Sequence, residues 1–373
     1  MQPSTRRSVL AGTAALALAA LTGPLMAADF DLEALIEAAR EEPPINVYDS
    51  TSKIIAMAEA FTAKYGVEAT GVKVRAENQA EMVRREAQAG NVQGDVVILS
   101  DVPAGILELL PEGHLASWLP PDLAADIPEA FQDPLVVVNS AAIFAFNTEA
   151  APEGCPIDNI WALTEPEWRG RVAMQDPLNR GELTDWFNQL ATHADDAIAA
   201  AYEKRYGKTL AGGGDATTAW VEALAANGPL LTDSDQAISD AVGAPGQSES
   251  FIGIVSSAKF RDNDGKGYKL GLCDDVEPMI GFSQPKLALV ATGTDSPNAA
   301  RLFVHYVMTP EGIAPQMDDG KMSTNVDATL PADEPSGIGA VMDRVFAFTA
   351  ATAGDDLDRR QDWQDVWRLN YTR

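Results

Sequence analysis

Five short polar segments carry the residues whose types and spacing could do chemistry. Each follows the end of a predicted strand, and together they offer hydroxyls, carboxylates and the basic side chains of Lys53, Arg180 and Lys259. Backbone N–H groups at a helix start, with hydroxyls and cations beside them, suit a phosphate, sulfate or carboxylate group. The segments are Asp49-Ser50-Thr51-Ser52-Lys53, Ser100-Asp101, Asp176-Pro177-Leu178-Asn179-Arg180-Gly181, Thr232-Asp233-Ser234 and Ser256-Ser257-Ala258-Lys259.

The same segments also have a purely structural explanation. Each could be a plain N-cap, which stabilises its own helix by about 1 kcal/mol. In open α/β sheets, however, ligands bind beyond the carboxyl ends of the strands, so segments at equivalent places favour a shared cleft. The predicted ligand-binding residues are Ser50, Thr51, Ser52, Lys53, Ser100, Asp101, Asp176, Asn179, Arg180, Asp233, Ser256 and Ser257.

No catalytic constellation can be assembled from the sequence. It contains no Gly-x-Ser-x-Gly, Gly-x-x-x-x-Gly-Lys or His-Glu-x-x-His motif, and His114, His193 and His305 are scattered. We therefore predict a binding protein, not an enzyme, that needs no cofactor. A site assembled from distant residues would leave no such local trace.

Alternating strands and helices must position the polar segments. Helical spacing of apolar residues predicts helices over 29–41, from about 53 to Gly66, and over 78–89, with strands at 45–48, 67–74 and 95–99. Later in the chain, strands are expected at 172–174, 230–232, 251–255 and 285–292, and helices at 183–194, on both sides of Gly212-Gly213-Gly214, at 297–308 and through 336–371. This alternation predicts an α/β fold with mostly parallel sheets flanked by helices.

Two features of this pattern leave alternatives open. The apolar run at 134–147 exceeds a normal strand, and it could form two strands or one strand that crosses between lobes. In the tail, Trp363 and Trp367 are spaced one helical turn apart, which favours core packing over a ligand cage.

Composition excludes several classes of protein. The chain has 373 residues, with 27 Lys+Arg against 55 Asp+Glu and a formal net charge of -28. Nucleic acids and anionic membranes require clustered basic residues, so neither is expected as a partner. Hydrophobic residues make up 46 %, which is enough for a sizeable core and excludes a disordered acidic tail.

Residues 1–28 have the pattern of an export signal. Arg6 and Arg7 precede an apolar stretch, and small residues follow near Ala27-Ala28, where cleavage is expected. The paired arginines favour the twin-arginine route, although an ordinary secretory signal has the same three parts. We expect a periplasmic mature protein with a charge of -30, because this segment contains two arginines and no acid.

The sequence has 2 cysteines, Cys155 and Cys273. In an oxidising compartment they could form a disulfide, and two buried free thiols are the alternative. We slightly favour the disulfide, which would stabilise the fold by roughly 4–5 kcal/mol in the chain-entropy model.

Several motifs together resemble the periplasmic solute-binding proteins of ABC transporters, in the two-lobed group that includes ferric-iron binding proteins. They are Ile45-Asn46-Val47-Tyr48 with Tyr65-Gly66, Asp95-Val96-Val97, Ala145-Phe146-Asn147-Thr148, Trp161-Ala162-Leu163, Pro166-Glu167-Trp168-Arg169-Gly170-Arg171-Val172-Ala173 with Asp176-Pro177, Pro297-Asn298-Ala299-Ala300-Arg301-Leu302-Phe303, and Thr309-Pro310-Glu311-Gly312. The resemblance implies a type II periplasmic binding protein fold with a ligand cleft between two lobes. It also implies a monomer that delivers a small molecule to a membrane permease.

The resemblance suggests how the chain divides. We expect the first lobe at 29–138 and 277–335, the second at 139–276, and C-terminal helices at 336–373 that pack on a lobe. Lobe closure would bury the ligand and present a closed surface to the permease.

The ligand stays open at this stage. Ferric binders of the group hold iron with adjacent tyrosines, and this chain has no Tyr-Tyr pair, although Tyr202 and Tyr206 lie one helical turn apart. The serine- and threonine-rich segments favour an anionic organic ligand, with a sugar phosphate as the sharpest candidate. Ferric iron is the alternative, and so is a cation such as thiamine or a polyamine, which Asp101, Asp233, Tyr48 and the acidic composition would suit.

Overall fold

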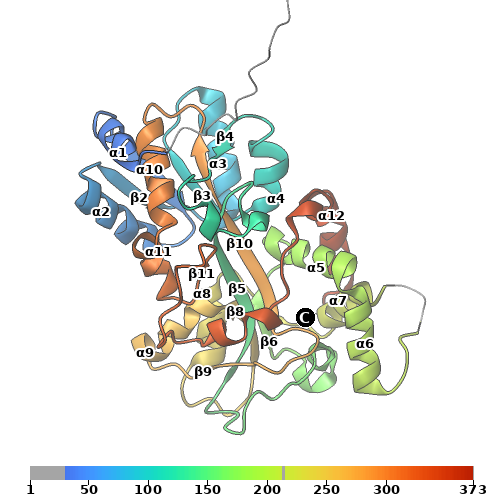
Figure 1. The fold of residues 1–373 in the computed structure, drawn as a ribbon. Coiled ribbons are helices and arrows are strands. Elements are labelled where there is room, and N and C mark those ends of the chain that lie inside the picture. Colours follow the sequence, from blue (N-terminus) through green and yellow to red (C-terminus); the bar gives the residue numbers. More distant parts are fainter. Residues whose placement is uncertain (1–29, 212–214, 373) are drawn as a thin grey trace, which may run out of the picture. The chain divides into compact units, whose positions relative to one another are not determined.

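A computed structural model describes residues 30–211 and 215–372 (Figure 1). The predicted export signal at 1–28 and the glycines at 212–214 lie outside the described residues. The strands are β1 (Ile45–Asp49), β2 (Ala69–Lys73), β3 (Val96–Leu99), β4 (Leu115–Ser117), β5 (Val136–Asn147), β6 (Val172–Gln175), β7 (Leu230–Thr232), β8 (Ile252–Ser256), β9 (Leu270–Leu272), β10 (Gly281–Ala291) and β11 (Met322–Ser323). The helices are α1 (Leu32–Arg40), α2 (Lys53–Tyr65), α3 (Ala76–Ala89), α4 (Val102–Ala104), α5 (Gly181–His193), α6 (Asp195–Tyr206), α7 (Ala216–Ala226), α8 (Asp235–Gly243), α9 (Asp262–Lys266), α10 (Pro297–Val307), α11 (Pro310–Met317) and α12 (Ala353–Asn370).

The strands form one hydrogen-bonded sheet with parallel ends and an antiparallel middle. Its order is β2-β1-β3-β10-β5-β8-β6-β7. In addition, β4 pairs with β10, and β9 and β11 pair with β5. β1 is parallel to β2 and β3, and β6 is parallel to β7 and β8, whereas β5 and β10 run antiparallel to their neighbours. We refer to β1–β3 with their helices as the first lobe and to β6–β8 with theirs as the second. The lobe boundaries predicted from the sequence stay a prediction.

β5 and β10 cross from one lobe to the other. The long apolar run forms the single 12-residue strand β5, so the alternative of two strands is wrong. β5 and β10 pair from Ile143 opposite Gly281 to Val136 opposite Leu287, and Figure 1 shows them side by side. Gly281 permits this approach, because a Cβ atom there would lie 2.1 Å from the carbonyl oxygen of Ala142.

Apolar side chains from the helices and the sheet build separate cores within the unit Leu32–Arg373. In the first lobe, Phe61 of α2 contacts Phe303 of α10, with ring centroids 5.1 Å apart. In the second, Trp363 and Trp367 of α12 each lie 6.0 Å from Phe187 of α5. Both tryptophans are buried, which confirms that they pack in the core.

The two cysteines are bonded to each other. A disulfide joins Cys155 to Cys273, which decides between the two alternatives left by the sequence. Cys273 follows β9, and its backbone N–H donates to the carbonyl oxygen of Phe144 in β5. The disulfide therefore reinforces a pairing between distant parts of the second lobe.

The expected helix through 336–371 is only partly correct. Residues Ala353–Asn370 form α12, but the segment before it forms short 3₁₀ turns. This segment instead follows the crossing strand, because the backbone N–H of Ser283 donates to the carbonyl oxygen of Phe346. Within the described ranges, no helix combines the length and apolar character needed to cross a membrane.

Candidate ligand-binding cleft

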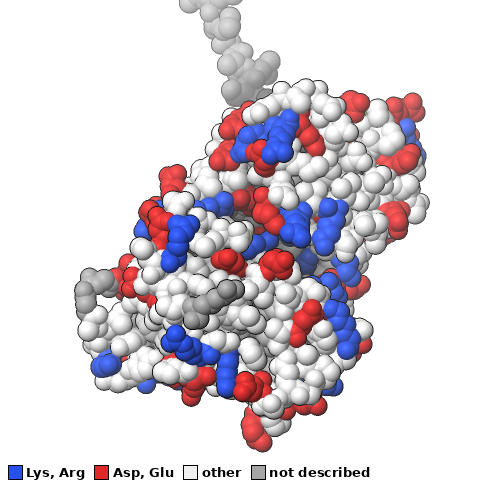
Figure 2. All heavy atoms as spheres, turned by 180° about the vertical axis from the view of Figure 1, so that it is seen from behind, with Lys and Arg blue, Asp and Glu red and all other residues white. Residues whose placement is uncertain are grey.

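A cavity of about 320 Å³ lies at the strand ends between the two lobes. Ser50 and Ser100 follow β1 and β3 on one side, and Gln175 and Ser256 end β6 and β8 on the other. Figure 2 shows Lys and Arg side chains gathered around a hollow in the middle of one face. Small-molecule sites have volumes of roughly 300–1,000 Å³, so this cleft can hold a small solute.

The structure brings seven of the predicted residues together in this cleft. They come from segments that are far apart in the chain, as a shared cleft requires. The lining includes Ser50, Thr51, Ser52, Ser100, Arg180, Asp233 and Ser256, and Lys259 beside them. That these residues contact a ligand stays a prediction.

Lys53 and Asp101 do not line the cavity and are engaged with protein groups instead. The Lys53 ammonium lies 3.3 Å from a carboxylate oxygen of Asp319. The Asp101 carboxylate caps α4, accepting from the backbone N–H of Ala104 at 3.2 Å, and pairs with Arg360. For Asp101, the capping explanation describes the observed geometry.

Asp176, Asn179 and Ser257 also lie outside the cavity lining. The Asp176 carboxylate accepts from the backbone N–H of Leu178 at 3.0 Å and from the Asn179 amide at 3.2 Å. The Ser257 hydroxyl donates to the carbonyl oxygen of Gly320. These contacts organise the loop before α5 and the turn after β8.

Basic side chains outnumber acidic ones in the cleft. Seven basic residues face four acidic ones, although the whole chain has a formal charge of -28. This local surplus opposes the overall charge, so the cleft favours a negatively charged group. The basic residues are Lys73, Arg75, Arg180, Lys259, Arg261, Lys286 and Lys321, and the acidic ones are Glu77, Glu182, Asp233 and Asp235.

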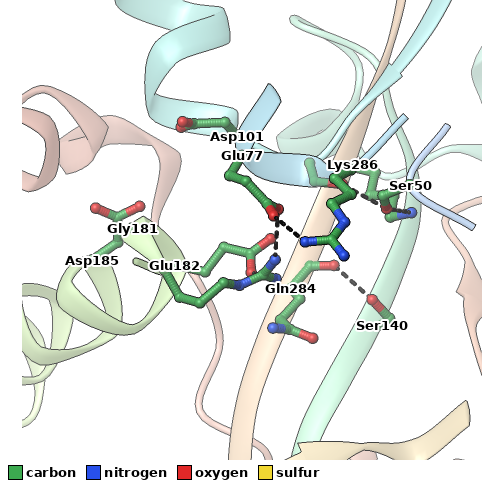
Figure 3. Close-up of polar contacts among 12 residues, drawn as sticks. Ser50, Glu77, Asp101, Ser140, Gly181, Glu182, Asp185, Gln284 and Lys286 are labelled. Atoms are coloured by element: carbon green, nitrogen blue, oxygen red, sulfur yellow. Dashed lines mark hydrogen bonds and ion pairs between the residues drawn. The ribbon is translucent and has the colours of Figure 1, made fainter. Parts of the chain in front are cut away.

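Lys286 is a cleft residue that the sequence analysis missed. It lies in β10, where its ammonium donates to the Asp49 carboxylate at 2.6 Å. It also donates to the Ser50 hydroxyl at 2.8 Å (Figure 3). Asp49 is fully buried, so Lys286 compensates a charge that would otherwise be costly. The sequence did contain one indication of a functional role for Lys286, since it is the single lysine in a strongly apolar predicted strand.

Lys321 is a second missed residue, and its position is unusual for a lysine. It is only 7 % exposed, yet it lines the cavity. Its ammonium has a neutral partner, the Gln316 amide oxygen, at 3.5 Å. Burial, and then the positive charge of Lys286, lower the pKa of Lys321 to about 7. No local sequence pattern marks such a residue.

Arg180 lines the cleft and connects the two lobes. Its guanidinium donates to Glu77 of α3 at 3.2 Å and forms an ion pair with Glu182 of α5. Figure 3 shows the carboxylates of Glu77 and Glu182 pointing toward the same place from opposite lobes. Part of the Arg180 charge is therefore neutralised by the protein itself.

Arg360 of α12 forms a second connection between the lobes. It donates two hydrogen bonds to Asp185 of α5, at 2.7 and 2.6 Å, and two to Asp101, at 3.0 and 2.7 Å. Burial raises the pKa of Asp185 to about 7, outweighing the opposite influence of Arg360. One guanidinium thus holds carboxylates from both lobes.

One buried acceptor in the cleft lacks a partner among the described residues. The side-chain oxygen of Gln175 is buried and accepts no hydrogen bond, although Gln175 lines the cavity. Buried polar atoms are normally paired, so the Gln175 side chain is an exception in the wall of the cleft.

The described residues offer no metal-binding cluster of three or more His, Cys, Asp or Glu side chains. Tyr202 and Tyr206 do not line the cleft and pack against each other, with ring centroids 4.7 Å apart. Tyr206 also donates a hydrogen bond to Glu165 at 3.0 Å.

Comparison with solved structures identifies the fold. Iron-bound HitA from Pseudomonas aeruginosa has a TM-score of 0.66 and 18% identity, over 87% of this chain and 99% of its own. AfuA from Actinobacillus pleuropneumoniae, a periplasmic binding protein with exogenous fructose-6-phosphate bound, has a TM-score of 0.63 and 20% identity, over 87% of this chain and 99% of its own. AgtB from Agrobacterium tumefaciens, in complex with agropinic acid, has a TM-score of 0.61 and 15% identity, over 87% of this chain and 98% of its own. The predicted two-lobed type II periplasmic binding protein fold is confirmed.

The family follows from the sequence itself. A family model described as bacterial extracellular solute-binding protein matches residues 45–320. The chain belongs to this family and is a solute-binding protein, as its motifs predicted. A comparison with curated protein sequences found no match.

Proposed function

We propose that this chain is the periplasmic substrate-binding component of an ABC importer for an anionic organic solute, with a sugar phosphate as the sharpest candidate. The observation that carries this proposal is the surplus of basic side chains in the cleft of a strongly acidic protein. Hydroxyls of Ser50, Ser100 and Ser256 line the same cavity and can bind a polar, oxygen-rich ligand. Lobe closure would bury the solute and present it to the permease.

Two other classes of ligand, iron and an organic cation, fit this lining less well. Iron is bound in the HitA structure, but no tyrosine among the described residues lines this cavity. Thiamine or a polyamine would need carboxylates and aromatic faces. The lining contains no aromatic side chain among the described residues, and its net charge is positive. The chemistry of the lining therefore favours the anion.

The remaining parts of the proposal rest on the sequence and the family. Residues 1–28 would direct the chain to the periplasm by the twin-arginine route, and the mature protein would act as a monomer with no enzymatic activity. A Lys replacement of Arg6 and Arg7 should stop export of the folded protein if this route is used. Unchanged export of that variant would indicate the general secretory route.

A thermal-shift panel tests the ligand class. The mature protein is heated with fructose 6-phosphate, inorganic phosphate, thiamine, spermidine and ferric citrate, each in large excess. A ligand that binds only the folded state at a hundredfold excess over its Kd stabilises by about 2.7 kcal/mol, so the melting temperature should rise by several degrees. We expect this rise with the phosphate compounds; a rise with iron or the cations alone would refute the proposal.

Placing one negative charge in the cleft should weaken anion binding strongly. Gln284 lies on β10 and lines the cavity beside Lys286, so Gln284→Glu adds a charge without changing the side chain's shape. At an effective dielectric constant of about 20, repulsion of this kind should reduce the affinity for fructose 6-phosphate by about tenfold to a hundredfold. Isothermal titration calorimetry measures the change.

The matched control places the same charge away from the cleft. Gln93 is exposed in the loop before β3, and Gln93→Glu should change the affinity less than twofold. Equal affinities of wild type and Gln284→Glu would show that the anion binds elsewhere.

A further inference from the structure

A buried group of charges closes one end of the cleft. Lys286 and Lys321 line the cavity, and Asp49 and Gln316 lie behind them, outside the lining. The Gln316 amide donates to the Asp49 carboxylate at 3.0 Å, while its oxygen accepts from Lys321. All four residues are buried.

This end of the cleft has more positive than negative charge. Asp49 compensates Lys286, and Asp319, itself 2 % exposed, pairs with both Lys53 and Arg261. With every lysine protonated, four cations would face two carboxylates. The surplus of two positive charges has no counterpart among the described residues in contact with them.

We propose that this end of the cleft is a subsite for a dianionic phosphoryl group, and that its occupation transfers a proton from solvent to the Lys321 amine. The inference rests on the proposed function and names the part of the solute that the protein recognises. A carboxylate would bring one negative charge, whereas a phosphate monoester at neutral pH brings between about 1.5 and 2. The two charges of the phosphoryl group match the surplus.

The hydroxyls around the lysines suit phosphoryl oxygens. Ser50 accepts from Lys286 (Figure 3). Its hydroxyl lies 3.0 Å from the Ser100 hydroxyl, and both residues line the cavity. Ser140 of β5 lines the same region, donating at present to the carbonyl oxygen of Gln284 at 2.9 Å. Charged donors and hydroxyls can thus approach several oxygens of one group.

Proton uptake follows from the surroundings of Lys321. The charged groups that face it are Lys286 of β10, Asp49 of β1, Asp319 after α11 and Arg261 after β8. Burial, with the repulsion from Lys286, holds the pKa of Lys321 at about 7, so above neutral pH the amine is largely unprotonated. A dianion in the cavity favours the protonated form and raises this pKa, and the added proton comes from water or buffer.

Calorimetry can count this proton. The probes are fructose 6-phosphate and inorganic phosphate, titrated into the mature protein near pH 8 in HEPES and in Tris, which have different ionisation enthalpies. The phosphate monoester has a second pKa of about 6, so it is already dianionic and contributes no proton. We expect an uptake approaching one proton per ligand in wild type, and close to none in Lys321→Met.

A cation from the open part of the cleft provides the control. Lys73 lines the cavity but is exposed, so Lys73→Met should retain proton uptake even where its affinity falls. Lys321→Gln serves as a second variant if the methionine variant does not fold. Inorganic phosphate with the same uptake as the ester would show that the phosphoryl group alone is recognised.

The outcomes separate this inference from the proposed function. Binding of the phosphate ester without proton uptake in wild type, or uptake that persists in both Lys321 variants, would overturn the inference and leave the proposed function standing. Failure of every phosphate compound to bind would overturn both.

Discussion

Replacing Arg360 by methionine should destabilise the protein by about 3–5 kcal/mol at pH 8. The change removes four hydrogen bonds between charged groups and leaves the Asp101 and Asp185 carboxylates without their shared cation. Asp185 is almost completely buried, and removal of one partner from a buried ion pair typically costs this amount. Urea denaturation of the mature protein measures the change in the free energy of unfolding.

The cost should depend on pH in a defined direction. The pKa of Asp185 is raised to about 7 in the folded state, against about 3.9 in an unfolded chain, so the folded state binds the extra proton between these values. The stability that Asp185 contributes by binding this proton is therefore present at low pH and is lost as the pH rises through 7. Without Arg360 the pKa of Asp185 should rise further, so the destabilisation should be smaller at pH 6 than at pH 8.

Two variants serve as controls, one for the loss of an arginine from α12 and one for the pH dependence. Arg368 forms an exposed pair with Asp365, and Arg368→Met should change the stability by less than about 1 kcal/mol. Asp185→Asn should remove most of the pH dependence. If Arg360→Met is as stable as Arg368→Met at pH 8, Arg360 does not hold the lobes together.

Removal of the disulfide should have an effect of similar size. The bond joins residues 118 positions apart, so it restricts the unfolded chain over a long loop. In the chain-entropy model this restriction amounts to about 4–5 kcal/mol, and the Cys155→Ala/Cys273→Ala protein should lose that much stability. The midpoint and slope of urea unfolding report it.

Reductant supplies the matched control for the disulfide. Wild type under strong reduction should unfold like the double variant, and the double variant should not respond to reductant. A double variant within about 1 kcal/mol of oxidised wild type would show that the bridge contributes little beyond the β5–β9 pairing around it.

Much of the fold could be predicted because it depends on local patterns. Helical spacing placed α1, α2 and α10, and apolar runs placed β1, β3 and β8. The tail was predicted less well, since residues before Ala353 form only short 3₁₀ turns and are held to β10 by the bridge between Phe282 and Phe346. Pairing of this kind depends on a partner far away in the chain.

The candidate site could be predicted only where a residue follows a strand end. Ser50, Ser100 and Ser256 satisfy that rule and line the cleft. Lys286 and Lys321 do not follow strand ends. The fold places Lys286 beside Asp49 and Lys321 beside Gln316, and these partners are distant or unmarked in the sequence. Local sequence cannot show that a lysine is buried or which charge it faces.

The net negative charge of the chain does not describe the charge of the cleft. Acidity alone weighed mildly toward a cationic ligand, but the acids are concentrated elsewhere and the cleft is locally basic. Recognition of an anion would therefore depend on short-range contacts, which salt screens less than surface charge.

Recognition of the phosphoryl group can be tested directly by comparing the binding of a sugar with that of its phosphate ester. Fructose 6-phosphate and fructose are titrated separately into the mature protein by isothermal titration calorimetry at the same pH and ionic strength. We expect saturable binding of one molecule of fructose 6-phosphate and no measurable binding of fructose. Equal affinity for both, or binding of neither while ferric citrate or spermidine binds, would contradict it.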